Sequence, residues 1–95
     1  MGILELRAKR ELILRIAAGY GASEVRVFGS VARGEDDPES DVDFLVRLEP
    51  GVTLFRHAAL TRELSAALGC KVDVISERGL RPRIRDQVMA QAIPL

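Results

Sequence analysis

Residues 27–46 read VFGSVARGEDDPESDVDFLV and contain most of the information about how this chain folds. An apolar run ends at Gly29 in a Gly-Ser pair, where glycine permits the backbone conformations of a tight turn. After an acidic stretch, the alternating run DVDFLVR (41–47) has the period of two that is typical of a half-buried strand. This stretch predicts strand, turn, loop and strand, with Asp41 and Asp43 on the same strand face.

The flanking sequence alternates between helical and strand-like patterns. Helices are predicted over 3–19, 54–68 (after Thr53 as N-cap) and 81–91, and further strands over 24–28 and 71–76. These elements predict an α+β fold: a small mixed sheet of at least three strands with helices packed on one face. At 95 residues, we expect one domain over 1–95. The order of the strands does not follow from these patterns.

The composition excludes several classes of protein. Fourteen basic residues balance fourteen acidic ones, so we expect no direct nucleic-acid partner, since such binding needs surplus positive charge. Cys70 is the only cysteine, which excludes an internal disulfide and a Cys-based metal site. Neither a signal peptide nor a membrane-spanning run is apparent, and we therefore expect no membrane association and a cytoplasmic protein.

The paired acids suggest metal chemistry. Two carboxylates on one strand face repel each other, and a divalent cation between Asp41 and Asp43 would remove that cost. Oxygen ligands without nearby histidine or cysteine suit Mg²⁺. Asp73 occupies a similar place in the strand predicted over 71–76. If the two strands are adjacent, three carboxylates converge, and such a set can hold two ions about 3.5–4 Å apart for in-line phosphoryl displacement.

The Gly-Ser turn suggests a phosphate site. At Gly29 the backbone can approach a phosphate closely, and Ser30 adds a hydroxyl donor. Arg33 lies three residues further along and is within reach of a phosphate.

The combination G-S-x10-D-x-D, between two apolar strands and followed by a later strand that carries Asp73, resembles the DNA polymerase β-like nucleotidyltransferase superfamily. The stretch 27–46 is similar to that of its minimal members, the MNT-type nucleotidyltransferases. The resemblance extends from Val25 to Ser76, and the C-terminal IRDQVMAQAIPL also resembles the ends of such chains.

This resemblance implies roles for the residues that match the motif. Asp41 and Asp43 would bind both metal ions, and Asp73 would hold the catalytic ion and act as, or assist, the base for the attacking hydroxyl. Gly29 and Ser30 would hold the β- and γ-phosphates of a nucleoside triphosphate. Attack on the α-phosphorus would release pyrophosphate.

The resemblance also implies a reaction and a partner. We expect Mg²⁺-dependent transfer of AMP from ATP to a hydroxyl. Minimal members of the family are paired with a small helical HEPN-type toxin, whose tyrosine they adenylylate, and act as its antitoxin. About twenty residues follow the last predicted strand, so we expect the acceptor to be held by another protein or a second copy, in a homo- or hetero-oligomer. An alternative is a non-catalytic module that neutralises its partner by occlusion; modification of an aminoglycoside or a nucleic-acid end is a third reading.

Several of these residues also have simpler interpretations. Asp41, Asp43 and Asp73 would also suit exposed strand positions, and Arg33 a plain surface charge. The simpler reading is the preferred one for the acids of the loop, the only histidine and the cysteine: Glu35, Asp36, Asp37, Glu39, His57 and Cys70. The arginines of 78–85 suit either a solvated helix face or a partner-facing patch.

Overall fold

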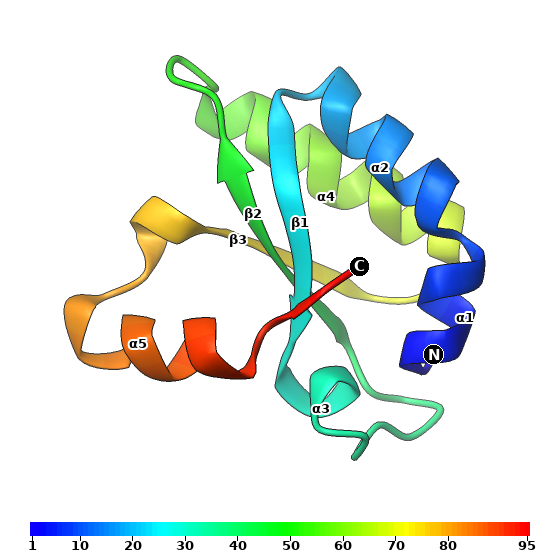
Figure 1. Ribbon diagram of the computed structural model, residues 1–95. Coiled ribbons are helices and arrows are strands. Elements are labelled where there is room, and N and C mark those ends of the chain that lie inside the picture. Colours follow the sequence, from blue (N-terminus) through cyan, green and yellow to red (C-terminus); the bar gives the residue numbers. More distant parts are fainter.

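Four strands form one mixed sheet in the order β3-β2-β1-β4 in the computed structural model, which describes all 95 residues (Figure 1). The strands are β1 (Ala22–Phe28), β2 (Val42–Leu48), β3 (Val72–Ser76) and β4 (Ile93–Pro94). The helices are α1 (Ile3–Ala8), α2 (Arg10–Gly19), α3 (Gly29–Ala32), α4 (Leu54–Leu68) and α5 (Pro82–Gln91), with a 3-10 turn η1 (Glu77–Gly79). None of these helices combines the length and the hydropathy that a membrane crossing requires.

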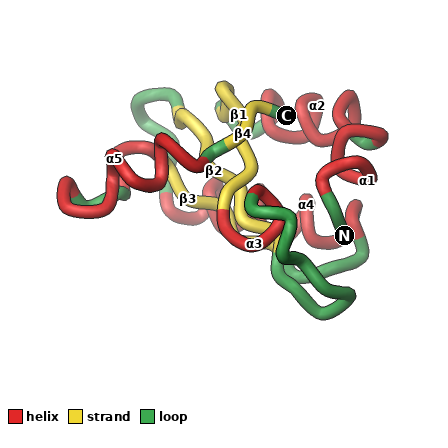
Figure 2. Tube along the Cα trace, turned by 60° about the horizontal axis from the view of Figure 1, so that its bottom comes forward, coloured by secondary structure: helices red, strands yellow, loops and turns green.

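The sheet combines antiparallel and parallel pairing. The two central strands, β1 and β2, pair antiparallel to each other. Strand β3 pairs parallel to β2 at one edge of the sheet, and β4 pairs antiparallel to β1 at the other edge. Helices α1, α2 and α4 lie together on one face of the sheet (Figure 1). Helix α5 lies on the other side of the strands in both views (Figure 2). The α+β prediction, with a mixed sheet and packed helices on one face, is therefore confirmed.

The core lies between the sheet and its three packed helices. As the alternation predicts, Val42, Phe44 and Val46 of β2 are fully buried on the helix-facing side. The same core cluster contains buried side chains from the three helices and from the neighbouring strands: Leu6 of α1, Ile13 of α2, Leu60 and Leu64 of α4, Val27 of β1, and Val72 and Val74 of β3. Leu45 is also fully buried, although it points to the opposite face and is not part of this cluster. The second face of the sheet is therefore partly covered.

The structure corrects the prediction of one helix over 3–19. Helix α1 ends at Ala8, Lys9 has φ −103° and ψ 14°, and α2 starts at Arg10. The Lys9 N–H donates to the Leu6 carbonyl, which is the tight bonding of a 3-10 turn at a helix end. No glycine or proline marks this break, so the helical spacing of apolar residues continues across it.

Other boundaries agree with the local sequence signals. Helix α4 has the predicted bounds, and its N-cap Thr53 accepts a hydrogen bond from the Arg56 N–H at 3.1 Å. Gly69 ends the helix in a left-handed conformation. Strand β2 is shifted by one residue from the predicted 41–47, so that Asp41 precedes it. The two-residue strand β4 was not predicted, because so short a segment has no recognisable period.

Candidate functional site

Two of the three predicted acids face each other across neighbouring strands. Asp43 of β2 and Asp73 of β3 are register partners in the parallel pair, and Asp41 lies one residue before β2. Asp43 is half-buried, whereas Asp73 is exposed. Strands β2 and β3 are adjacent, which is the arrangement on which the three-carboxylate hypothesis depends. The structure therefore brings these residues to one end of the sheet.

The predicted glycine turn lies directly against one of these carboxylates. Phe28, the last residue of β1, is the register partner of Asp43, so Gly29 follows at the same level of the sheet. Gly29 has φ +73°, in the region that favours glycine. A Cβ atom placed on Gly29 would overlap Oδ2 of Asp43. Both the backbone conformation and the close approach of the carboxylate thus require glycine here.

The other two predicted phosphate-binding residues lie on and just after α3. Ser30 is half-buried, and its hydroxyl makes no hydrogen bond to the rest of the chain. Arg33 is exposed, and its Nε donates to Oε2 of Glu35 at 3.0 Å. The positive charge of Arg33 nevertheless acts on Asp43, because it lowers the pKa of that carboxyl. Arg33 is therefore close enough to the acids to act on them electrostatically.

The electrostatics at this end of the sheet disfavour charge on Asp43. Burial raises the pKa of Asp43, the negative charges of Asp73 and Asp41 raise it further, and Arg33 opposes them only in part. A carboxyl group whose pKa is shifted by burial and by specific charged neighbours is a typical feature of a functional site. A cation bound beside Asp43 would relieve both the burial cost and the repulsion.

The three aspartates have the type of ligand atom that a magnesium site requires. Asp41, Asp43 and Asp73 offer only carboxylate oxygens, the ligands that Mg²⁺ prefers. As they stand, no three acidic, histidine or cysteine side chains are close enough together to enclose an ion. Asp41 Oδ2 is instead 3.5 Å from Nζ of Lys71, and the two side chains are 40% and 74% exposed. Since such an exposed ion pair contributes only about 0–1 kcal/mol, it is a small obstacle to rotation of Asp41 towards its neighbours.

Several residues with a simpler interpretation stay outside this site. Nε2 of His57 is 2.7 Å from the Val74 carbonyl, to which it donates, so this histidine connects α4 to β3. In the acidic loop, Asp37 accepts from the Glu39 N–H, and its own N–H donates to Ser40 Oγ. These bonds organise the loop itself. Cys70 is free and half-buried at the edge of the core.

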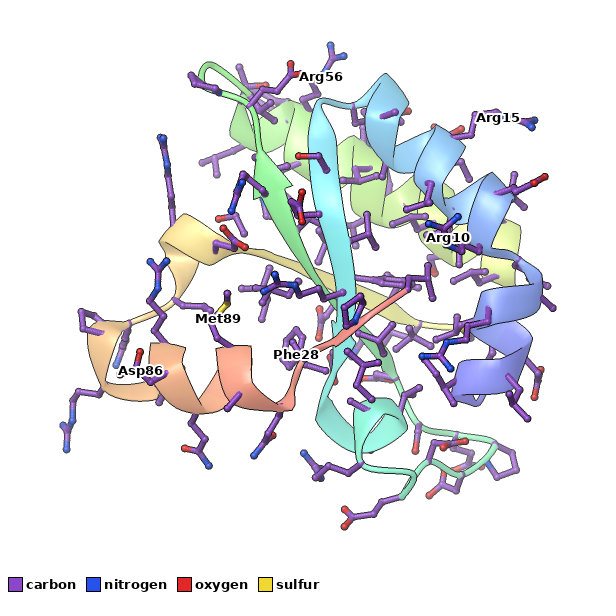
Figure 3. All side chains as sticks on the ribbon, viewed as in Figure 1. Arg10, Arg15, Phe28, Arg56, Asp86 and Met89 are labelled. Atoms are coloured by element: carbon purple, nitrogen blue, oxygen red, sulfur yellow. The ribbon has the colours of Figure 1, made fainter.

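The sequence reasoning did not single out two cations near the acids. Lys71 is the ion-pair partner of Asp41. Arg26, two residues before Phe28 and so on the same face of β1, lies in register with Leu45, and its Nη1 donates to Sδ of Met89 at 3.7 Å. Figure 3 shows Met89 reaching from α5 towards the strands. The sequence pattern that could have identified Arg26 is its place between Val25 and Val27. In a strand with alternating faces, a charged side chain between two apolar ones projects away from the core.

The raised pKa of Asp43 predicts how stability depends on pH. A folded-state pKa above the ordinary value of about 3.9 means that folding favours the protonated carboxyl. Its stabilising contribution is present below the unfolded-state pKa and is lost as the pH rises through the folded-state pKa. In chelator-treated protein, Asp43→Asn is therefore expected to increase the free energy of unfolding at pH 7, and to change it much less at pH 3. Urea unfolding at both values measures this.

The matched control is Asp86→Asn on α5, where the side chain is exposed. It should leave the free energy of unfolding unchanged at both pH values. An Asp43→Asn protein that is less stable than the wild type at pH 7 would contradict the predicted charge repulsion.

Comparison with known proteins gives matches over most of the chain. The family model described as nucleotidyltransferase domain matches residues 9–95. A protein adenylyltransferase, MntA of Thermococcus cleftensis, is 36% identical over 74 residues, which cover 78% of this chain and 75% of that protein. Both matched regions include the turn at Gly29 and the acids that follow it.

Two solved structures have similar folds. A candidate minimal nucleotidyltransferase is 55% identical with a TM-score of 0.89, over 100% of this chain and 97% of that one. A chain from the complex of a tri-AMPylated HEPN toxin of Shewanella oneidensis with an MNT antitoxin has a TM-score of 0.71 over 93% of this chain and 69% of that one. At 19% identity, this second likeness concerns the fold alone.

Proposed function

Because this chain belongs to the nucleotidyltransferase domain family and is a nucleotidyltransferase, we propose that it transfers AMP from ATP to a tyrosine of a HEPN-type toxin and acts as its antitoxin. The proposal treats residues 1–95 as one minimal catalytic domain. Its main support is the contact of the Gly29 turn with Asp43, opposite Asp73. The protein adenylyltransferase relative and the fold shared with an MNT antitoxin support the choice of acceptor.

Asp41, Asp43 and Asp73 are the residues that would hold two Mg²⁺ ions. The ions would neutralise charge at the transferred phosphoryl group and make the acceptor hydroxyl more acidic. The raised pKa of Asp43 supports this assignment, since burial and two neighbouring carboxylates favour a bound cation over an empty cluster.

Gly29, Ser30 and Arg33 would hold the triphosphate. Without a side chain at Gly29, the backbone can approach the β- and γ-phosphates. The Ser30 hydroxyl is free to donate to a phosphate oxygen, and Arg33 would exchange its exposed partner Glu35 for phosphate charge. These contacts would hold the α-phosphorus close to Asp43 and Asp73.

Asp73 would accept the proton of the acceptor hydroxyl. Its side chain is exposed, so a hydroxyl from another protein can reach it. The acceptor oxygen would form a bond to the α-phosphorus as the bond from that phosphorus to the bridging oxygen breaks. Pyrophosphate leaves with the electron pair of that bond, and the hydroxyl proton passes to the Asp73 carboxylate.

The test is adenylylation of the HEPN-type protein by purified wild type with ATP and Mg²⁺. We expect the partner to gain the mass of AMP on tyrosine, and Asp41→Asn/Asp43→Asn to slow this gain at least about 10²-fold. The measurement is intact-mass and peptide mass spectrometry over time.

The control is Asp36→Asn/Asp37→Asn, which removes two acids of the adjoining loop and preserves the side-chain oxygen that accepts from Glu39. It should transfer AMP at nearly the wild-type rate. The proposal fails if the wild type binds ATP and Mg²⁺ but adds no mass to its partner. Stoichiometric suppression of the partner by Asp41→Asn/Asp43→Asn would favour the non-catalytic alternative, occlusion.

A further inference from the structure

Two large apolar side chains are almost fully exposed on the first turn of α4. Leu54 is 86% exposed and Phe55 is 88% exposed, more than any other large hydrophobic residue of the chain. The buried stripe of the same helix begins only at Leu60. Single exposed apolar residues are ordinary, but adjacent ones with this exposure are typical of contact surfaces. Neither side chain has a structural role in the core.

Leu54 and His57 border both of two neighbouring hollows. One, of about 650 Å³, lies at the carboxyl ends of β2 and β3 and is lined by Arg47, Arg78 and Arg85 among others. The other, of about 430 Å³, is lined by Thr61 and Arg62 of α4. The surface therefore combines two exposed apolar side chains with hollows that arginines help to line.

Basic residues outnumber acidic ones around the larger hollow: Arg47, Arg78 and Arg85 line it, together with Glu49 and Glu77. Segment 78–85, RGLRPRIR, has four arginines and no acid. None of these four arginines forms an ion pair in the structure. Of the arginines that line the hollow, only Arg47 is paired: its Nε is 3.2 Å from Oε2 of Glu77. Helix α5, to which Arg85 belongs, has no buried residue. The free cations at this rim favour an acidic ligand.

We propose that Leu54, Phe55, Arg78 and Arg85 form a docking surface for an acidic segment of a protein partner that also inserts an apolar side chain. The inference rests on the proposed function, because the partner in question is the HEPN-type acceptor. A protein partner is favoured over nucleic acid because the chain carries no net charge, whereas nucleic-acid binding needs surplus positive charge. Buried apolar contacts with a charged rim are the common anatomy of protein interfaces.

The docking surface is separate from the transfer site but within reach of the same partner. Arg47, in the wall of the larger hollow, lies four residues along β2 from Asp43, about 13 Å at 3.3 Å per residue. By strand alternation the two residues project from the same face. A partner bound at this end can therefore extend along that face and present its tyrosine to the aspartates.

This arrangement predicts that substitutions in the docking surface weaken binding of the partner without slowing the transfer step. Leu54→Ser/Phe55→Ser and Arg78→Glu/Arg85→Glu should each raise the KM for the HEPN-type partner by about tenfold or more. The kcat at saturating partner and the KM for ATP should stay within about twofold of wild type, because the aspartates are untouched. The arginine effect should weaken at high salt, unlike the apolar effect.

Matched controls are available on the helices at the opposite side of the molecule. Leu4→Ser removes a side chain that is 78% exposed on α1, and Arg7→Glu/Arg10→Glu makes the same change of charge on exposed residues. Both should leave the KM for the partner unchanged. All variants substitute exposed residues, and thermal unfolding checks that each is folded.

Three results would overturn the docking surface: an unchanged partner KM in both surface variants, an equal rise in the controls, or no binding of the partner by wild type in calorimetry. Binding of an oligouridine RNA that is lost in the arginine variant, with partner KM unchanged, would instead assign the surface to nucleic acid. If wild type binds the partner without transferring AMP, the proposed function fails. The partner affinities of the same variants then decide the docking surface independently.

Discussion

Gly29→Ala is expected to reduce AMP transfer at least about 10²-fold, since even a displacement of about 1 Å in a reacting group has an effect of this size. The added methyl would overlap Oδ2 of Asp43, so either the carboxylate or the turn must move. The backbone at φ +73° adds strain of about 1–2 kcal/mol. Initial rates of transfer and urea unfolding measure the two consequences separately.

The chain provides a control that isolates the collision from the strain. Gly34 has φ +70° and lies just beyond α3, but nothing lies within 4 Å of a Cβ placed there. Gly34→Ala should therefore lose a similar amount of unfolding free energy and retain most of its transfer rate. If both variants lose transfer equally, the contact between Gly29 and Asp43 has no special role in the reaction.

Asp73→Asn is expected to lower kcat by about 10²–10⁴-fold, the usual contribution of a general base. The amide keeps the size of the side chain but can neither accept the hydroxyl proton nor bind a cation strongly. Because Gly29, Ser30 and Arg33 are unchanged, the KM for ATP should rise far less than kcat falls. Steady-state rates at varied ATP, with saturating partner, separate the two effects.

Asp86→Asn is the corresponding control, because Asp86 is an exposed aspartate on α5 and not one of the three proposed ligands (Figure 3). It should have wild-type kinetics. An Asp73→Asn enzyme with wild-type kcat would exclude this carboxylate as the proton acceptor, and an equal change in both variants would indicate a general effect of charge.

The site illustrates a conflict between stability and function. In the folded chain, Asp43 is half-buried beside two other acids, and its pKa is raised as a result. This arrangement destabilises the ion-free protein at neutral pH. A bound cation would reverse the effect, so the wild type should gain stability from Mg²⁺.

Much of the site was predictable because its signals are local. The turn at Gly29, the strand containing Asp43 and the capped helix 54–68 each depend on residues within a few positions of one another. The family was recognisable for the same reason, since its motif lies within one stretch of the chain. Segment 78–85 was noticed as a possible partner-facing patch from its charge alone.

The exposure of Leu54 and Phe55, in contrast, was not predictable from periodicity. A helix with apolar residues on its first turn can bury them if a neighbouring element covers that end. Here the turn before α4 and the segment after β3 border a hollow instead. Likewise, the alternation of β2 places Leu45 on the same face as Asp43, away from the main core, yet its side chain is fully buried.

The amino-acid sequence by itself determined the α+β class, most of the elements and the residues of the proposed site, through periods, caps and turns that act over short distances. Only the tertiary structure decided the order β3-β2-β1-β4, the register of Asp43 with Asp73 and the break at Lys9. Strand pairing joins residues about thirty positions apart, and its energy depends on which faces the whole chain can bury together. No local pattern contains that information.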